Sequence, residues 1–342
     1  MSTPSPALPH VLPRLLPRAI PGALAGALAL GLAASAGAQT SLTVYTSQPV
    51  DQMEEVIALF NEMHPEITVE LFRSGTTEVM NRLMTEVEGG SPQADVLLIA
   101  DTVAMTQVKE AGLLLPWPEA PVEGLPAGQY DPDMTFFGTK LITTGIVWNT
   151  ASGAPRPESW TDLLAEEARN QVVMPSPLYS GAAVIHVGTL ANTEGFGWDF
   201  IEGLEENGAI AVRGNGGVRD AVARGERAYG VLIDYMAFGA AAEGSPVEFV
   251  FPAEGVTAIN QPVAILNTSE NVEAAQTFVA FQLGQAAQEL SVQQLYFPLL
   301  EGVAPPEGFP DPATLDIMEV DPAVILEQTD EIMRRFADLF GG

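Results

Sequence analysis

The chain has 342 residues, and 44 acidic against 14 basic side chains give it a formal net charge of −30. A field of this sign repels phosphate backbones and anionic lipid surfaces, so it excludes nucleic acid and membrane surfaces as partners. The chain has no cysteine, which excludes disulfide bonds, a thiol nucleophile and a lipid-anchoring cysteine. Stability must come from a large core, which about 300 residues bury more naturally in two lobes than in one.

The first 38 residues have the pattern of a cleavable export signal. Arg14 and Arg18 supply its positive segment, an apolar run of mostly Ala, Leu and Gly covers 23–33, and residues 36–38 (Ala-Gly-Ala) offer a cleavage site. A membrane anchor is the alternative, but the apolar run is far shorter than the roughly 20 residues of a spanning helix. We therefore expect a signal peptide at 1–38 and a periplasmic mature protein without a lipid anchor.

Behind the leader, hydrophobic periodicity predicts alternating strands and helices. The expected strands cover 42–46, 67–72, 94–99, 141–150, 171–174, 228–233, 247–251 and 263–266. The expected helices cover 50–63, 76–87 and 321–339, and others begin near 101, 159, 180, 215, 234 and 272. A proline-rich stretch at 116–133 interrupts this order as a surface loop. The repeated order of strand, helix and strand predicts an α/β fold with mostly parallel sheet covered by helices.

Polar residues lie where the first two expected strands end. They are Tyr45, Thr46, Ser47, Gln48, Ser74, Gly75, Thr76 and Thr77. Small ligands bind at the carboxyl ends of strands in an open α/β sheet, and helix starts favour anions. The alternative for each residue is an ordinary strand-to-helix turn or helix cap. Together they predict a secreted binding protein.

Six segments occur in an order that resembles the ferric-ion type of periplasmic solute-binding proteins of ABC importers. They are LTVYTSQ, ADVLLIAD with KEAGLLLPW behind it, GIVWNT, PSPLYSGAA, GERAYGVLIDY, and the stretch from VFPAEG to VAIL. The resemblance covers nearly the whole mature chain. It implies two lobes, each a central mostly parallel sheet flanked by helices, joined by hinge strands near 143–149 and 249–256.

The resemblance also implies how the chain is divided and how it works. The first lobe would comprise 41–143 and 252–290, and the second 144–251 and 291–342. A small ligand would bind in the cleft between them and select the closed state by hinge bending. The protein, expected to be a monomer, would then deliver its ligand to a membrane permease that an ATPase drives.

The iron ligands of that family are largely missing from this chain. In register, Pro49 replaces a His, Ala100 replaces a Glu, and Tyr235-Met236 replaces a pair of Tyr. A ferric ion wants several anionic oxygens, and one phenolate cannot supply them, although Asp101 and Asp234 lie one residue from lost positions. We therefore expect no metal and no cofactor, and a ferric ion or its chelate is the alternative ligand.

The family's anion pocket, in contrast, is retained. The resemblance implies that Ser180, Gly181 and Ala182 offer amides and a hydroxyl to an anion, and that Asn215 is a further ligand at its usual separation from Tyr235. Asp234 would pair with a ligand amine or with a structural partner such as Arg219. The expected ligand is a small organic anion, a phosphonate or phosphate ester before a carboxylate.

Other classes of protein fit the residues less well. The chain has no GxSxG segment, and after cleavage its only histidines are His64 and His186, so we expect no enzyme. The same scarcity of ligands argues against zinc or copper. A subunit that reports its ligand to a membrane receptor is the remaining alternative, because the same fold serves both roles.

Overall fold

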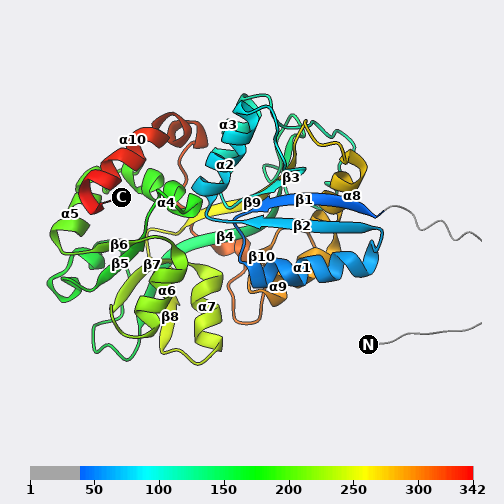
Figure 1. Cartoon of the computed structure of the whole chain (residues 1–342). Coiled ribbons are helices and arrows are strands. Elements are labelled where there is room, and N and C mark those ends of the chain that lie inside the picture. The colour runs from blue at the N-terminus through cyan, green and yellow to red at the C-terminus, as the bar shows by residue number, and fades with distance from the viewer. Residues whose placement is uncertain (1–38, 342) are drawn as a thin grey trace, which may run out of the picture. The chain divides into compact units, whose positions relative to one another are not determined.

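Strands and helices alternate along residues 39–341, which the computed structural model describes (Figure 1). The expected signal peptide at 1–38 lies outside the described residues. The strands are β1 (Thr40–Thr46), β2 (Ile67–Arg73), β3 (Val96–Leu98), β4 (Phe136–Asn149), β5 (Val172–Pro175), β6 (Ile210–Val212), β7 (Tyr229–Ile233), β8 (Val247–Val250), β9 (Thr257–Ile265) and β10 (Phe297–Pro298). The helices are α1 (Val50–Met63), α2 (Thr76–Glu88), α3 (Thr102–Glu110), α4 (Gly181–Asn192), α5 (Gly197–Glu206), α6 (Asn215–Ala223), α7 (Asp234–Ala242), α8 (Val272–Leu283), α9 (Gln285–Gln293) and α10 (Pro322–Phe340).

All of these strands belong to one sheet with β9 and β4 at its centre. The order is β2-β1-β3-β9-β4-β7-β5-β6, and β8 and β10 also pair with β4. Strands β2, β1 and β3 are parallel to one another, as are β7, β5 and β6. The central pair runs antiparallel to each other and to its neighbours β3 and β7. The sheet thus has two parallel halves, as expected, but they are continuous through the two crossing strands (Figure 1).

Each half of the sheet has its own hydrophobic core. We call the half with β1–β3, α1–α3, α8 and α9 the first lobe, and the half with β5–β8 and α4–α7 the second lobe. In the first lobe, side chains of β1 alternate: Leu42 and Val44 pack toward α1 and α8, and Tyr45 packs toward α2. In the second lobe, one cluster surrounds Trp160, to which Phe336 of α10 belongs.

Residues 291–300 contact both cores. Leu299 packs in the cluster of Leu42 and Val44 of the first lobe, and β10 pairs with β4 at Lys140 and Leu141. Tyr296 belongs to the second-lobe cluster, against which Leu295 packs. The sequence placed this segment in the second lobe, and that boundary stays a prediction.

Two helices begin at the capping residues that the sequence predicted. Asp101 caps α3 by accepting a hydrogen bond from the Ala104 amide at 2.9 Å, and Ser180 caps α4 through the Ala183 amide at 3.4 Å. The element expected from Ser159 is instead a short 3-10 helix, Trp160–Leu164. Its two buried side chains, Trp160 and Leu163, are three residues apart, which matches the period of a 3-10 turn.

Two further differences concern short elements and the second connection between lobes. The strand expected at 249–256 ends at Val250, a turn follows, and β9 supplies the second crossing strand. Neither α5 nor β6 was expected, since β6 has only three residues and gives no readable alternation. Within 39–341, no helix is both long and apolar enough to span a bilayer.

Candidate functional site

A cavity of about 430 Å³ lies where strands of both lobes end. From the first lobe, Ser47, Arg73 and Ala100 reach it just at or beyond the carboxyl ends of β1, β2 and β3. From the second lobe, Tyr179, Arg213 and Ile233 occupy the corresponding positions for β5, β6 and β7. The remaining lining residues are Gln48, Pro49, Val50, Gly75, Thr76, Ile142, Ser180, Gly181, Ala182, Gly214, Asn215, Gly216, Gly217, Arg219, Tyr235, Met236, Gln261 and Tyr296. This is the edge at which open α/β sheets bind ligands.

Five helices begin at the wall of this cavity. The caps and first residues of α1, α2, α4, α6 and α7 all contribute lining atoms. The first N–H groups of a helix have no partner within the helix, and its dipole places partial positive charge at that end. Two helix starts come from the first lobe and three from the second. The cavity is therefore electrically suited to an anion held between the lobes.

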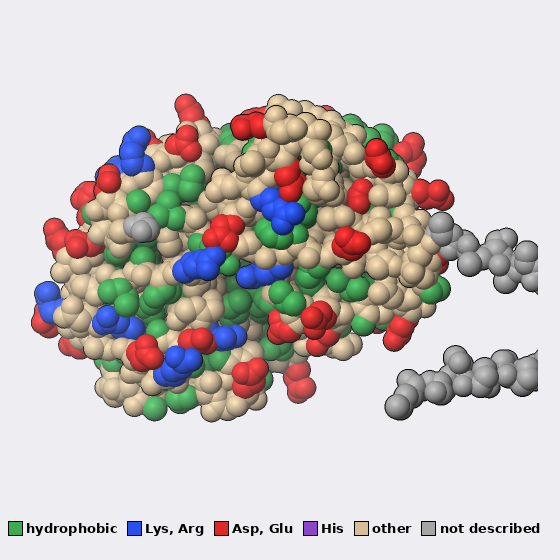
Figure 2. Space-filling model, viewed as in Figure 1, with side chains coloured by type: hydrophobic (Ala, Val, Ile, Leu, Met, Phe, Trp, Pro, Cys, Tyr) green, Lys and Arg blue, Asp and Glu red, His purple; other side chains and the backbone are tan. Residues whose placement is uncertain are grey.

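The charged side chains at the cavity have one sign. Of the 14 basic residues, Arg14 and Arg18 precede the described part, and three of the other twelve, Arg73, Arg213 and Arg219, line the cavity. No Asp or Glu within 39–341 lines it, although the chain has 44 of them. Figure 2 shows acidic side chains spread over the visible face, with basic ones from its left side to its middle. Arg213 pairs with Glu78 and Arg219 with Asp220, so Arg73 and the helix starts supply most of the positive field, which favours an anionic ligand over a cation.

Ser180 and Asn215 form a polar pair at the second-lobe wall. The Asn215 Nδ2 donates to the Ser180 Oγ at 3.1 Å, which joins the start of α6 to the start of α4. The buried Oδ1 of Asn215 has no hydrogen-bond partner among the described residues, and the same holds for Oε1 of the lining residue Gln261. Buried polar atoms are nearly always hydrogen-bonded, so these two oxygens mark places for a donor of a ligand or water.

Tyr179 joins the two lobes across the cavity mouth. Its ring lies against Gly75 of the first lobe and Gly214 of the second, and a Cβ on either glycine would come within 3 Å of ring carbons. Its hydroxyl lies 3.3 Å from Nη1 of Arg73, which also donates to the carbonyls of Ser47 and Gln48. The two glycines thus allow a close approach that no other residue type permits.

An ion pair connects the lobes beside this tyrosine. Arg213 Nη2 lies 2.5 Å from Oε1 of Glu78, and its guanidinium stacks 4.4 Å from the Tyr179 ring centroid. Ser74 donates to the same Glu78 carboxylate, and this contact lowers the pKa of Glu78 more than the arginine does. Because the Arg213 side chain is 70% exposed, the pair itself is worth at most about 1 kcal/mol.

The cavity wall also carries uncharged hydrogen-bonding groups. The rings of Tyr235 and Tyr296 lie 4.2 Å apart, and burial raises the pKa of Tyr235 to about 12. Tyr296 donates to Gln52 at 2.5 Å, and Gln48 donates to Gln294 at 3.3 Å. Both tyrosines are therefore neutral phenols over the physiological pH range, able to hydrogen-bond a ligand.

The structure brings most of the predicted site residues together. Those that line the cavity are Ser47, Gln48, Gly75, Thr76, Ser180, Gly181, Ala182, Asn215 and Tyr235. Those that do not line it are Tyr45, Thr46, Ser74, Thr77, Asp101 and Asp234. Each residue of the second group has a hydrogen-bond partner within the protein.

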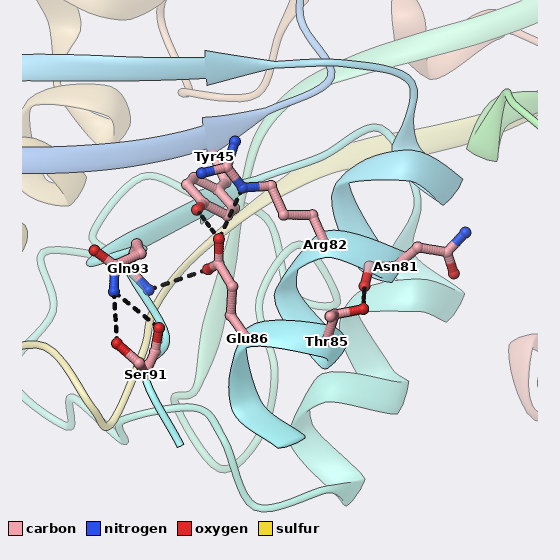
Figure 3. A network of polar contacts seen from close by, with 7 residues as sticks. All are labelled: Tyr45, Asn81, Arg82, Thr85, Glu86, Ser91 and Gln93. Atoms are coloured by element: carbon pink, nitrogen blue, oxygen red, sulfur yellow. Dashed lines mark hydrogen bonds and ion pairs between the residues drawn. The ribbon is translucent and has the colours of Figure 1, made fainter. Parts of the chain in front are cut away.

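Tyr45 does not line the cavity, and its side chain points toward Glu86 and Arg82 of α2 (Figure 3). Strand alternation turns its side chain toward α2, where its hydroxyl donates to Glu86 at 2.6 Å, and Arg82 joins the same carboxylate at 2.8 Å. Burial, with a smaller contribution from Glu86, raises the pKa of Tyr45 to about 12. Tyr45 therefore belongs to the first-lobe core and not to the site.

Threonine and serine hydroxyls at the predicted turns bond to the protein itself. Thr46 donates to the Leu98 carbonyl at 2.8 Å and accepts from the Gln48 amide at 3.1 Å. Thr77 lies 3.4 Å from the Pro177 carbonyl of the other lobe. With Ser74 on Glu78, these hydroxyls shape the turns that carry the lining residues.

The two carboxylates offered as substitute ligands are buried and hydrogen-bonded within the protein. Asp234 accepts from the amide and hydroxyl of Thr143 at 2.9 and 2.8 Å and from the Tyr235 amide at 2.7 Å. Arg219, proposed as its partner, pairs with Asp220. Asp101 caps α3, and burial raises the pKa of both Asp101 and Asp234 to about 7. Neither carboxylate faces the cavity.

Several lining residues were not predicted. Tyr179, Arg213, Tyr296 and Gln261 come from four different elements or turns. Arg213 could have been predicted at the site from the sequence, because it directly precedes the helix start at Gly214-Asn215. Tyr296 had none, because only the fold brings the segment after α9 to the cavity.

The positions that lack the iron ligands also line the cavity. Pro49, Ala100 and Met236 are all wall residues. No group of three or more His, Asp or Glu suited to a metal ion occurs in the part of the chain that the structure describes. The wall at these places is apolar where a ferric ion needs anionic oxygens.

Two lobes around a cavity of strand ends and helix starts define a ligand-binding protein, and the comparisons give its family. The model of the bacterial extracellular solute-binding proteins matches residues 44–289. The chain belongs to this family. It is the substrate-binding component of an ABC transporter, not an enzyme.

Similar proteins include both iron and sugar-phosphate binders. The iron uptake protein A1 of Synechocystis is 26% identical over 78% of each chain. The periplasmic binding protein AfuA of Actinobacillus pleuropneumoniae, solved with fructose-6-phosphate, has a TM-score of 0.80 at 21% identity, covering 88% of this chain and 99% of its own. Iron-bound HitA of Pseudomonas aeruginosa has a TM-score of 0.77 at 20% identity, covering 87% and 99%. At these identities the solved structures establish the fold, which is that of two-lobed periplasmic binding proteins.

Proposed function

We propose that this protein captures a small organic phosphate or phosphonate in the cavity between its lobes and delivers it to the permease of an ABC importer. The observation that carries the proposal is the charge of the wall: three arginines, five helix starts and, within 39–341, no carboxylate. Anions bind at helix N-termini, and arginine is the side chain best matched to phosphate geometry.

The size of the cavity favours an organic ligand over a bare inorganic ion. A volume of about 430 Å³ falls within the range of sites for small organic molecules. The arginines and helix starts would hold the anionic group. Gln48, Gln261, Tyr235 and Tyr296 offer hydrogen bonds to hydroxyls or amines of the remainder. The structural neighbour with fructose-6-phosphate has a ligand of this kind.

Iron is the competing ligand, since two of the similar proteins take up or hold it. The neighbouring phenols of Tyr235 and Tyr296 are the one feature that favours it. Against it, burial holds the pKa of both phenols above the usual value, and the described wall has no carboxylate or imidazole beside them. The wall supports an organic anion better than a ferric ion.

A thermal-shift screen followed by calorimetry tests the proposal. Fructose 6-phosphate, a phosphonate, citrate and ferric citrate are added in turn to the purified mature chain. A ligand far above its dissociation constant stabilises the folded state by several kcal/mol, so the phosphate or phosphonate should raise the melting temperature most. Stabilisation by ferric citrate alone would contradict the proposal.

Paired substitutions locate the ligand. Replacing Ser180 and Asn215 by Ala removes two hydrogen-bonding groups, each worth roughly 1.5–3 kcal/mol toward a charged ligand. The double variant should therefore bind the responding anion at least about tenfold more weakly. Thr277→Ala is the matched control, since Thr277 of α8 does not line the cavity and its hydroxyl bonds to the Glu273 carbonyl within its own helix. Unchanged affinity in the double variant would move the site elsewhere.

Export and assembly complete the proposal. The family is extracellular, and we infer that residues 1–38 direct export to the periplasm and are then removed. There the protein acts as a monomer, whose closed form the permease recognises.

A further inference from the structure

A buried lysine lies directly behind the wall of the cavity. Lys140 of β4 is 1% exposed, and its ammonium nitrogen donates to Oε1 of Gln48 at 3.2 Å. The same nitrogen lies 4.4 Å from the centroid of the Tyr296 ring. Both Gln48 and Tyr296 line the cavity, so the charge of Lys140 is one side chain away from a bound ligand.

Lys140 differs from the other lysine of the chain in having no acidic partner. Lys109 pairs with Asp131 at 2.6 Å and Asp133 at 2.7 Å. Among the described residues, Lys140 has no carboxylate within ion-pair distance, only an amide oxygen and an aromatic face. A buried ammonium without a counter-charge is costly, and burial lowers the pKa of Lys140 to about 7.

The side chains next to Lys140 in the hydrogen-bond network are neutral amides. Gln294, at the end of α9, accepts from Gln48, and Gln288 of α9 donates to the carbonyl of Thr139, which precedes Lys140. Among the described residues, charged groups contact these neighbours but not Lys140 itself. Glu55 of α1 accepts from Gln294, Asp51 and Asp234 contribute to the raised pKa of both cavity tyrosines, and Arg73 acts to lower that of Tyr235. The missing counter-charge would be supplied by an anion in the cavity.

We propose that Lys140 is a positioning residue that couples anion capture to the uptake of one proton: its amine is neutral beside the empty cavity and becomes an ammonium when an anion binds. This inference rests on the proposed function. The proton comes from solvent and adds to the amine lone pair, and no bond is broken. The ammonium then holds Gln48 by its amide oxygen and lies over the Tyr296 ring, so it fixes two residues of the cavity wall in place.

The direction of the pH dependence follows from the linkage between binding and protonation. Below about pH 7 Lys140 is already charged and binding takes up no proton. Above that pH, binding must raise the pKa of Lys140, so affinity falls by up to about tenfold per pH unit. A phosphate ester becomes doubly charged above about pH 6. Its affinity should therefore be greatest between about pH 6 and pH 7.

Nuclear magnetic resonance of lysine side chains tests the first half of the proposal. Because the chain has only two lysines, ε-carbon labelling gives two signals, and Lys109→Arg assigns them. In the free protein the Lys140 signal should titrate near pH 7 and the Lys109 signal well above it. Saturating fructose 6-phosphate should move the Lys140 titration upward by at least about two pH units, which is the shift needed for uptake of nearly one proton at pH 8. A free-protein titration near pH 10 would overturn the proposal.

Calorimetry in two buffers of different ionisation enthalpy counts the protons. At pH 8 fructose 6-phosphate is already a dianion, so proton uptake reports the protein alone, and we expect about one proton per ligand. Lys140→Met, which removes the amine, and Lys140→Arg, which is permanently charged, should both abolish the uptake. The Lys140→Arg variant should keep its affinity as the pH rises above 7. Below pH 7, the Lys140→Met variant should bind about tenfold more weakly than the unchanged protein.

These measurements distinguish a failure of the proton coupling at Lys140 from a failure of the proposed ligand class. If citrate or ferric citrate shifts the Lys140 titration and no phosphate compound does, the proposed ligand fails and the coupling stands. If a phosphate compound binds but Lys140→Met takes up as many protons as the unchanged protein, the coupling fails and the ligand stands. Thermal unfolding of both variants verifies that they are folded. If none of these anions shifts the signal, the coupling is wrong.

Discussion

Replacing Gly75 by Ala tests whether the close contact between the lobes controls ligand capture. An added Cβ would lie 2.5–2.6 Å from three ring carbons of Tyr179. Non-bonded carbons normally approach to about 3.5–4.0 Å, so the ring and the first lobe would have to separate by about 1 Å. The backbone of Gly75 has φ −64° and ψ 156°, which alanine adopts without strain. The perturbation therefore acts on the closed arrangement of the lobes.

The magnitude follows from the cost of overpacking. An extra methyl group in a closely packed contact destabilises it by about 1–3 kcal/mol. In the proposed hinge closure the open form would not make this contact, so the whole effect would fall on closure and affinity should drop about 5- to 150-fold. Calorimetry with fructose 6-phosphate measures the affinity. X-ray scattering should show that the variant becomes less compact at saturation than the unchanged protein does.

Two variants make this test specific. Gly216 also lines the cavity, but a Cβ there would meet nothing within 4 Å, so Gly216→Ala should bind nearly normally. Adding Tyr179→Leu removes the ring that the new methyl meets. In the Tyr179→Leu background, Gly75→Ala should weaken ligand binding little further, and a double-mutant cycle measures this coupling. Normal affinity in Gly75→Ala, or an equal loss in Gly216→Ala, would refute the reasoning.

Two further predictions concern the lobe-bridging ion pair and a buried histidine. Glu78→Gln should weaken binding at most about fivefold and less at high salt, because the pair is exposed, whereas Arg213→Gln should weaken it more, since it also removes charge from the cavity. Equal losses in calorimetric titrations would mean that Arg213 acts only as a bridge. Burial lowers the pKa of His186 to about 3, below the unfolded value of 6.5. The unfolded chain then binds the extra proton between pH 6.5 and 3, so this contribution to stability is present above pH 6.5 and lost as the pH falls. His186→Gln should make the decline in urea-unfolding free energy over this range shallower by up to about 1.4 kcal/mol per pH unit, and an unchanged slope would contradict the prediction.

The order of elements could be read from the sequence because it depends on local patterns. The helix at 50–63 has its apolar residues at helical spacing, and the structure places α1 over the same residues. Ser180 and Asn215 were recognised as helix starts from their neighbours, and both lie at the cavity. Such signals are local, and tertiary packing did not override them.

Side-chain partners far apart in the sequence could not be predicted. Asp234 was expected near a ligand but bonds to Thr143, 91 positions away. Tyr45 was expected at the cavity, yet strand alternation turns it toward Glu86. Both errors come from knowing that a residue lies at a strand end without knowing which face its side chain takes.

The sequence by itself determined an α/β fold, a family of exported binding proteins, and a site at strand ends and helix starts, because these follow from periodicity, caps and motif order. Only the tertiary structure decided the composition of the cavity. It gathered Arg73, Arg213 and Arg219 while leaving the acidic residues of the described chain outside, and it placed Lys140 unpaired behind the wall. Charge at a site depends on which distant residues meet, and packing across the two lobes sets those meetings.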